Sequence, residues 1–242
     1  MPESLYLSIP KVETMSSLKL NNVLGIDTSH DETVIGLNGK IVTWKSVRNQ
    51  SKELLPKIDK LLKAKKIKPT KLRGIVVNIG PGSFTGLRVG ITVANGFGYG
   101  LKIPVVGISE FEAIKTFYPK VDIIVLDAKR GELFIQARKS APKLISANKL
   151  GDLIKIGTQV YVDDYRLIPI IHEQFKKAGT IYIPGLTRQQ KMTALLEMAD
   201  KQVSGLAGKL KDRTIKETGK LSQILPLYLR GANITRPRAK TQ

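Results

Sequence analysis

Residues 80–90 read GPGSFTGLRVG, and this stretch fixes the arrangement of the elements around it. It follows an apolar run at 74–79 that predicts a buried strand. It leads into a glycine-rich segment ending near residue 100, which we interpret as a helix. Because glycine costs about 1 kcal/mol per helix position relative to alanine, such a helix indicates close approach of another backbone. Small residues recur every four positions along one side of this helix, at Gly86, Gly90, Ala94 and Gly98.

The segments on either side predict an α/β unit with the order β-β-β-α-β-α-β-α. An Asn38-Gly39 dipeptide between the second and third strands is a strong hairpin signal. The first helix, over 51–66, carries its leucines and isoleucine on one apolar stripe. The expected strands are 22–27, 33–37, 41–47, 74–79 and 104–107, and the third helix begins at Ser109.

A second, looser copy of this unit follows in the chain. We therefore predict an α/β protein of two lobes that arose by duplication of the fold. The expected divisions are an N-terminal extension at 1–20, a first lobe at 21–110, a second lobe at 111–230 and a basic tail at 231–242. The elements expected in the second lobe are strands at 121–126, 132–138, 159–162 and 180–183, helices near 168–178 and 188–200, and a polar loop at 206–222.

The chain carries a net charge of +20, from 40 basic and 20 acidic residues. A basic protein attracts phosphate backbones without reading bases, although solvated lysines in a lysine-rich surface would give the same charge. The charge is spread along the chain, with a local peak at 63–73 and no acidic residue after 220. The candidate RNA contacts are Lys63, Lys65, Lys66, Lys68, Arg230, Arg236 and Arg238.

Several classes of protein are disfavoured by what the sequence lacks. There is no cysteine, which excludes disulfides and thiolate chemistry and is consistent with a reducing cytoplasm. No run of about 18 apolar residues is present, so we expect no membrane span. Residues 1–20 have neither the basic start nor the apolar core of a signal peptide.

Five motifs, in order, resemble those of the bacterial TsaB (YeaZ) family, and together they span about residues 22 to 230. The GPGSFTGLR loop at 80–88 is the family hallmark. The other motifs are LGIDTS at 24–29, SKELLP at 51–56, VLDAKRGE at 125–132 and LPLYLR at 225–230. The resemblance implies two ribonuclease H-like lobes of the actin, sugar-kinase and heat-shock ATPase superfamily.

The resemblance also implies a function and a set of partners. A TsaB-like chain would be the non-catalytic scaffold subunit that binds and activates a TsaD-like transferase. That transferase modifies the adenosine 3′ of the anticodon in tRNA with a threonylcarbamoyl group. A TsaE-like ATPase would dock on the complex, so ATP would be used by the complex and no cofactor would be bound by this chain alone. The tRNA would be held through the complex, and a homodimer would form when the partner is missing.

The resemblance places the partner interface on two helices, the one at 51–66 and the glycine-rich one that ends near residue 100. We accordingly expect Gly90→Leu to block association while leaving the chain folded. The interface residues expected are Leu54, Leu55, Ile58, Leu61, Leu62, Gly86, Leu87, Gly90, Ile91, Ala94 and Gly98.

A nucleotide site is the main alternative, as in an independent small-molecule kinase or ATPase of the same superfold. In those relatives an aspartate and hydroxyl groups after the first strand hold metal and phosphate, which here would be Asp27, Thr28 and Ser29, with Asp127 in the second lobe. Asp127 is followed by Ala-Lys-Arg, and the candidate adenosine loop is only Pro184-Gly185-Leu186. We therefore interpret the site as degenerate. These residues would then only end a strand and bond local backbone.

Metal and hydrolase chemistry find little support in the sequence. His30 and His172 are the only histidines and do not form a ligand pair, so we expect no metal site. Ser83 does not sit in a G-x-S-x-G elbow, which argues against a peptidase. The loop at 80–86 also lacks the Gly-Lys-Ser/Thr ending of a phosphate-binding P-loop. A structural or interface role of this loop is favoured.

Overall fold

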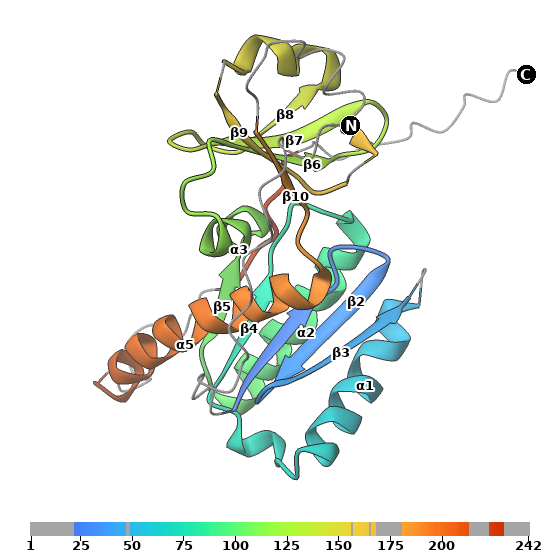
Figure 1. Ribbon diagram of the computed structural model, residues 1–242. Coiled ribbons are helices and arrows are strands. Elements are labelled where there is room, and N and C mark those ends of the chain that lie inside the picture. Colours follow the sequence, from blue (N-terminus) through green and yellow to red (C-terminus); the bar gives the residue numbers. More distant parts are fainter. Residues whose placement is uncertain are drawn as a thin grey trace, which may run out of the picture.

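In the computed structural model, two five-stranded mixed sheets lie one above the other, each at the centre of one lobe (Figure 1). This is the two-lobed α/β architecture that the sequence predicts. The structure describes residues 22–46, 49–155, 157–164, 166–167, 181–212 and 223–229. The expected extension at 1–20, the helix near 168–178 and the tail at 231–242 lie outside these residues.

The first sheet has the strand order β3-β2-β1-β4-β5. Strand β2 runs antiparallel to both β1 and β3, whereas β4 and β5 run parallel to β1. Both β1 and β4 are buried along their whole length, which explains why they read as continuous apolar runs. The strands are β1 (Val23–Asp27), β2 (Glu32–Leu37), β3 (Lys40–Lys45), β4 (Gly74–Asn78) and β5 (Val105–Ile108).

Helices cover both faces of the first sheet (Figure 1). On one face lie α1 (Gln50–Ala64) and α2 (Phe84–Leu101), and on the other lie α3 (Glu110–Phe117) and α5 (Arg188–Asp212). The sheet presents glycine to α5, because a Cβ on Gly25 or Gly36 would lie closer than 3.0 Å to a side chain of that helix. Hence α5 packs directly on the strand backbones, and most of its buried residues are apolar.

The second sheet has the order β10-β9-β6-β7-β8. Read from β8, the strands of this lobe lie in the order third, second, first, fourth and fifth along the chain, which is also their order in the first sheet. The same pattern of two antiparallel and two parallel pairings recurs. This repetition supports duplication of the fold. The elements are β6 (Ile123–Asp127), β7 (Glu132–Ala137), β8 (Lys143–Ser146), β9 (Gln159–Val162) and β10 (Ile181–Pro184), with short 3-10 helices η3 (Pro69–Lys71) in the first lobe and η4 (Ala147–Leu153) in the second.

Three features differ from the sequence prediction. Strand β8 and helix η4 were not expected, since neither has a long apolar pattern. Helix α5 continues to Asp212, so the first part of the expected loop at 206–222 is helical. Residues 213–222 lie outside the described residues. The assignment of 111–230 to the second lobe is also wrong for α5, which contacts β1, β2, β4 and β5 of the first sheet. The chain therefore crosses back to the first lobe after β10.

Residues 223–229 form an extended strap that joins the lobes. The Asn95 side chain exchanges two hydrogen bonds with the Ile224 backbone, and the Leu227 N–H donates to Ile79 O at 2.8 Å. Farther along, Tyr228 stacks on Phe84, and Leu229 packs against the second-lobe core. The strap thus ties α2 to the second lobe.

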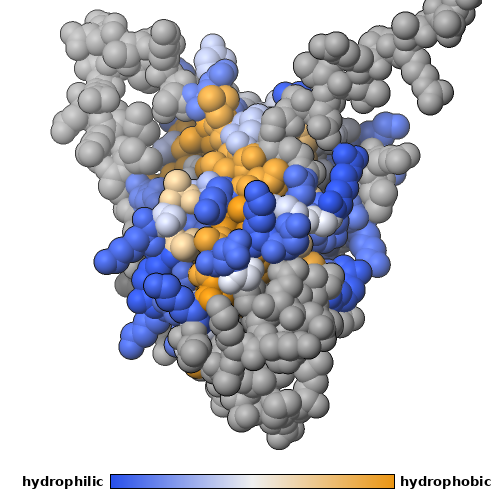
Figure 2. Space-filling view, turned by 90° about the horizontal axis from the view of Figure 1, so that it is seen from above, coloured by the Kyte–Doolittle hydropathy of each residue, from blue (hydrophilic) through white to orange (hydrophobic). Residues whose placement is uncertain are grey.

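Within the described ranges, no helix is long and apolar enough to cross a membrane. Seen from above, the molecule shows apolar side chains gathered along its middle, with hydrophilic side chains around them (Figure 2). In the second lobe the side chain of Leu153 in η4 is 38% exposed.

Candidate functional site

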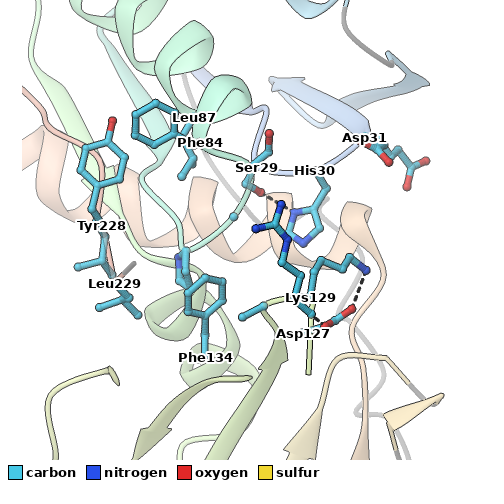
Figure 3. Close-up of a pocket in the computed structure, with 17 residues that line it drawn as sticks. Ser29, His30, Asp31, Phe84, Leu87, Asp127, Lys129, Phe134, Tyr228 and Leu229 are labelled. Atoms are coloured by element: carbon cyan, nitrogen blue, oxygen red, sulfur yellow. Dashed lines mark hydrogen bonds and ion pairs between the residues drawn. The ribbon is translucent and has the colours of Figure 1, made fainter. Parts of the chain in front are cut away.

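A cleft of about 740 Å³ lies between the lobes, at the ends of β1 and β6 (Figure 3). The first lobe contributes residues 29–32 and the loop at 81–84, and the second contributes the β6–β7 turn at 127–130. Its apolar walls include Phe84, Leu87 and Phe134, with Tyr228 and Leu229 of the strap closing one side. The sequence-predicted residues Ser29 and Asp127 both line this cleft.

The loop at 80–86 and the start of α2 are built around the end of β1. Ser83 is the N-cap of α2, and its Oγ accepts a hydrogen bond from Gly86 N at 3.2 Å. Thr28 Oγ1 donates to Gly86 O at 2.7 Å. A Cβ on Gly86 or Gly90 would lie closer than 3.0 Å to Thr28. These two glycines therefore allow α2 to touch the end of β1.

The small-residue side of α2 consequently faces its own sheet, not a partner. A Cβ on Gly98 would likewise collide with Val105 of β5. Ten of the eleven expected interface residues are buried in the first-lobe core, and the exception is Leu55, which is 49% exposed. The expectation that these ten form the partner interface is wrong, because the apolar stripes of both helices are used to cover the sheet. Because a side chain on Gly90 would collide with Thr28 inside the fold, we expect Gly90→Leu to unfold the chain and not only to block association.

Asp27 does not have the open surroundings that a metal–phosphate site needs. It is buried, and its Oδ1 accepts from Ser29 N at 2.9 Å and Ser29 Oγ at 2.6 Å. Its Oδ2 pairs with Arg188 of α5 at 3.3 Å. A guanidinium group from the same chain thus neutralises the carboxylate that would have bound a cation.

A buried ion network extends from Asp27 beneath the cleft. Arg188 also contacts Glu110 Oε1 at 3.2 Å, and Lys191 Nζ contacts the same oxygen at 2.7 Å. Lys191 contacts Asp163 as well, just after β9, so the network joins both lobes. We call Asp27, Glu110, Asp163, Arg188 and Lys191 the interlobe network. With all five groups ionised it carries one net negative charge.

The pKa of Glu110 is raised to about 7, chiefly because its carboxyl is buried. Lys191 opposes that rise in pKa, while the neighbouring carboxylates Asp27 and Asp163 add to it. Protonation of Glu110 would make the interlobe network neutral. Burial likewise lowers the pKa of Arg188, and Asp27 opposes this change.

One group of side chains among the described residues could hold a metal ion. The ligand atoms of His30, Glu110 and Asp163 lie within 4.8 Å of one another. The Lys191 ammonium already contacts two of these three groups. A divalent cation would therefore have to displace a buried ammonium, and the arrangement favours a permanent internal cation over metal chemistry.

The family described as TsaD, tRNA N6-adenosine threonylcarbamoyltransferase, matches residues 22–209. The chain belongs to this family. The TsaB/YeaZ resemblance that the five motifs carry is confirmed by curated relatives.

Two of these relatives are named tRNA threonylcarbamoyladenosine biosynthesis protein TsaB. The one from Buchnera aphidicola is 30% identical over 152 residues, which cover 55% of this chain and 72% of that protein. The one from Bacillus subtilis is 32% identical over 117 residues, or 47% of this chain and 49% of the relative. A solved Pseudomonas aeruginosa structure with similarity to the peptidase YEAZ has a TM-score of 0.60 at 18% identity, covering 87% of this chain and 100% of that chain. The fold of two ribonuclease H-like lobes is thereby confirmed.

In this TsaB-family chain, the second-lobe aspartate also has a local partner. Asp127 accepts from Lys129 N at 2.7 Å and pairs with Lys129 Nζ at 2.6 Å (Figure 3). Lys129 and Arg130 both adopt positive φ, at 62° and 58°. The β6–β7 turn therefore presents its own cation to Asp127.

The peptidase alternative gains no support from the site geometry. The serine that meets a histidine is Ser29, whose Oγ lies 2.8 Å from His30 Nδ1. That hydroxyl also contacts Asp27, and Ser29 is only 1% exposed. A nucleophile must reach its substrate, which this side chain does not.

Sequence reasoning missed most of the interlobe network. Glu110 carries only a helix-start signal, and Asp163 follows a strand without a motif. Lys191 lies among the buried residues of α5. In the sequence, a single lysine at this position looks like an ordinary surface residue. One signal was present, because Arg188 and Lys191 both lie in the first turn of a helix, where cations are disfavoured. Such a pair indicates that carboxylates lie nearby.

Proposed function

We propose that this chain is the non-catalytic subunit of a tRNA threonylcarbamoyladenosine machinery. It would bind and activate a TsaD-like transferase that modifies the adenosine 3′ of the anticodon. The names of its curated relatives support the pathway. The structural support for the scaffold role is the composition of the outward side of α1 and α2.

That outward side combines exposed apolar side chains with glycines that no internal contact explains. Tyr99 is 77% exposed and Leu55 is 49% exposed. Gly96 and Gly100 lie on the same exposed side of α2, and a Cβ on either would meet nothing within 4 Å. Each glycine weakens the helix by about 1 kcal/mol relative to alanine. We infer that the glycines are kept for close approach of a helix from another chain.

The partner that we propose for this surface is the TsaD-like transferase. It would belong to the same family and so offer matching helices, and a ridge of glycine allows two helices to pack closely. A second copy of this chain would occupy the same surface when the transferase is absent. A TsaE-like ATPase would join the complex, and tRNA would be bound through it.

The interlobe network supports the non-catalytic role. Arg188 and Lys191 hold the acidic groups that a kinase or ATPase would need for metal and phosphate. We accordingly propose that this chain binds no cofactor by itself and that ATP is used elsewhere in the complex. This arrangement weighs against the independent kinase or ATPase.

Replacing Gly96 tests the proposal, because a leucine there would fill the space that the partner needs. We expect Gly96→Leu to weaken binding of the transferase at least about 10-fold, as a clash at a packed interface costs several times RT. Thr116→Leu on α3, exposed on the opposite face of the sheet, is the matched control and should leave affinity unchanged. Titration calorimetry with the transferase of the same organism measures both. Equal affinities for Gly96→Leu and wild type would contradict the proposed surface.

A further inference from the structure

The end of the first lobe farthest from the cleft is strongly basic. Residues 57–73 carry eight basic and one acidic side chain, a net charge of +7, which is over a third of the charge of the whole chain. The acidic residue, Asp59, pairs with Lys63 at 2.7 Å. We call the following residues the basic end: Lys63, Lys65, Lys66, Lys68, Lys71 and Arg73.

Hydrogen bonds hold the basic end in one place. Lys65 Nζ donates to Asn38 O at 2.9 Å in the β2–β3 turn, and Asn38 exchanges hydrogen bonds with Asn22. Asn22 Nδ2 in turn donates to Lys71 O at 3.0 Å, and its carbonyl accepts from Arg73 N. The end of α1, the hairpin turn and η3 are therefore one ordered surface (Figure 1).

A lysine of α2 extends the basic end. Both α1 and α2 begin beside the cleft and so end together at the far side of the sheet. Lys66 follows α1 and Lys102 caps α2, and both are exposed. Each adopts φ near 54°, the left-handed region in which glycine is the favoured helix-ending residue. Two helices thus end on a lysine where glycine would be the less strained choice.

The chemistry of this surface fits a row of phosphates better than a protein or a membrane. In the described part of the chain, Tyr99 is the one exposed large apolar side chain near this end, three residues before Lys102. The others lie elsewhere, at Leu55, Phe84, Leu153, Leu225 and Tyr228. Protein interfaces are centred on apolar residues, and peripheral membrane surfaces insert them. Lysines with so little exposed apolar surface among them are typical of sequence-independent contacts with a nucleic-acid backbone.

We propose that the basic end is an RNA-binding surface that contacts the phosphate backbone directly. Given the proposed function, on which the identity of the RNA rests, the RNA would be tRNA. Helix ends favour cations through the helix dipole, and that alone would account for one lysine at each end. It does not account for Lys68, Lys71 and Arg73, which lie beyond α1.

The test is the salt dependence of RNA binding by the isolated full-length chain. The variant carries Lys66→Gln, Lys68→Gln and Lys71→Gln, and the probe is a fluorescently labelled, unmodified tRNA transcript followed by anisotropy from 50 to 250 mM KCl. Loss of three phosphate contacts should reduce the slope of log K against log[salt] by about 2 to 3. Affinity at 0.1 M salt should fall at least about 10-fold.

A matched control removes the same charge from the second lobe. Lys139→Gln, Lys143→Gln and Lys149→Gln change three exposed lysines, and we expect the affinity and the slope to stay close to wild type. Equal losses in both triple variants would show that only the net charge matters and would overturn the proposal. No loss in either variant would overturn it as well.

Two further measurements distinguish RNA binding by the basic end from binding of an acidic protein and from the scaffold role. Polyglutamate at equal charge concentration should compete with RNA weakly, and competition as strong as that of unlabelled tRNA would point to an acidic protein and overturn the RNA assignment. Both triple variants should still bind the transferase in calorimetry. If the variant of the basic end binds RNA and the transferase as wild type does, RNA binding by the basic end is refuted and the scaffold role is unaffected.

Discussion

Two glycines of α2 six residues apart should respond to the same substitution in opposite directions. At Gly96 an added methyl group meets nothing within 4 Å, so Gly96→Ala keeps the full gain in helix propensity of about 1 kcal/mol. At Gly90 the same methyl would lie closer than 3.0 Å to Thr28 Oγ1 and 3.4 Å from Ile26 Cγ2.

The cost at Gly90 exceeds the gain. Overpacking a core costs about 1–3 kcal/mol. Displacing Thr28 also breaks its buried hydrogen bond to Gly86 O, which costs about 1 kcal/mol. Against the propensity gain of about 1 kcal/mol, Gly90→Ala should destabilise the fold by about 1–3 kcal/mol.

Thermal unfolding followed by circular dichroism measures both variants. For a chain of this size 1 kcal/mol corresponds to about 2–4 °C in Tm. Gly96→Ala should therefore raise Tm by about 2–4 °C, and Gly90→Ala should lower it by at least about 2 °C. Destabilisation by Gly96→Ala, or a Tm for Gly90→Ala at or above wild type, would refute the assignment of the two sides of α2.

Three other substitutions test the site and the strap. Burial raises the pKa of Glu110 to about 7 in the folded state, so its contribution to stability is fully present below the ordinary carboxyl pKa and is lost as the pH rises through 7. Glu110→Gln should therefore remove a decline of about 3 kcal/mol in the free energy of unfolding between pH 4.5 and pH 8, measured by urea unfolding. Lys191→Met leaves the buried carboxylates without their ammonium and should cost about 3–5 kcal/mol in the same assay at pH 8, whereas a loss below 1 kcal/mol would show that the network is not buried as described. Asn95→Ala breaks both hydrogen bonds to Ile224 and should cost about 1–2 kcal/mol and speed amide exchange in the strap, with exchange at wild-type rates as the contrary result.

The first lobe follows closely from local sequence patterns. Strands β1 and β4 are apolar up to their last residue, an Asn-Gly turn joins β2 to β3, and Ser109 begins α3 with a capping box. Each of these elements therefore carries its own signal. The short strand β8 and helix η4 lack comparable signals, because four to seven residues give too few repeats of any period.

The direction in which a helix side faces is not encoded locally. A ridge such as Gly86 and Gly90 fits equally well against an internal sheet or against another protein. Here its close contact with Thr28 at the end of β1 shows that it packs on its own sheet. The position of α5 is similar, since its apolar stripe suits either lobe and glycines of β1, β2 and β4 make room for it. For long-range pairs such as Lys191 with Glu110, nothing in the sequence identifies which carboxylate the lysine meets.

The central claim is that this chain acts by binding a TsaD-like transferase, and size-exclusion chromatography with light scattering tests it most directly. The protein is run alone, and then mixed with the transferase of its own organism. We predict a stable complex of the two chains that forms at the expense of any homodimer. A chain that stays unassociated with the transferase at micromolar concentration and hydrolyses ATP by itself would contradict the account.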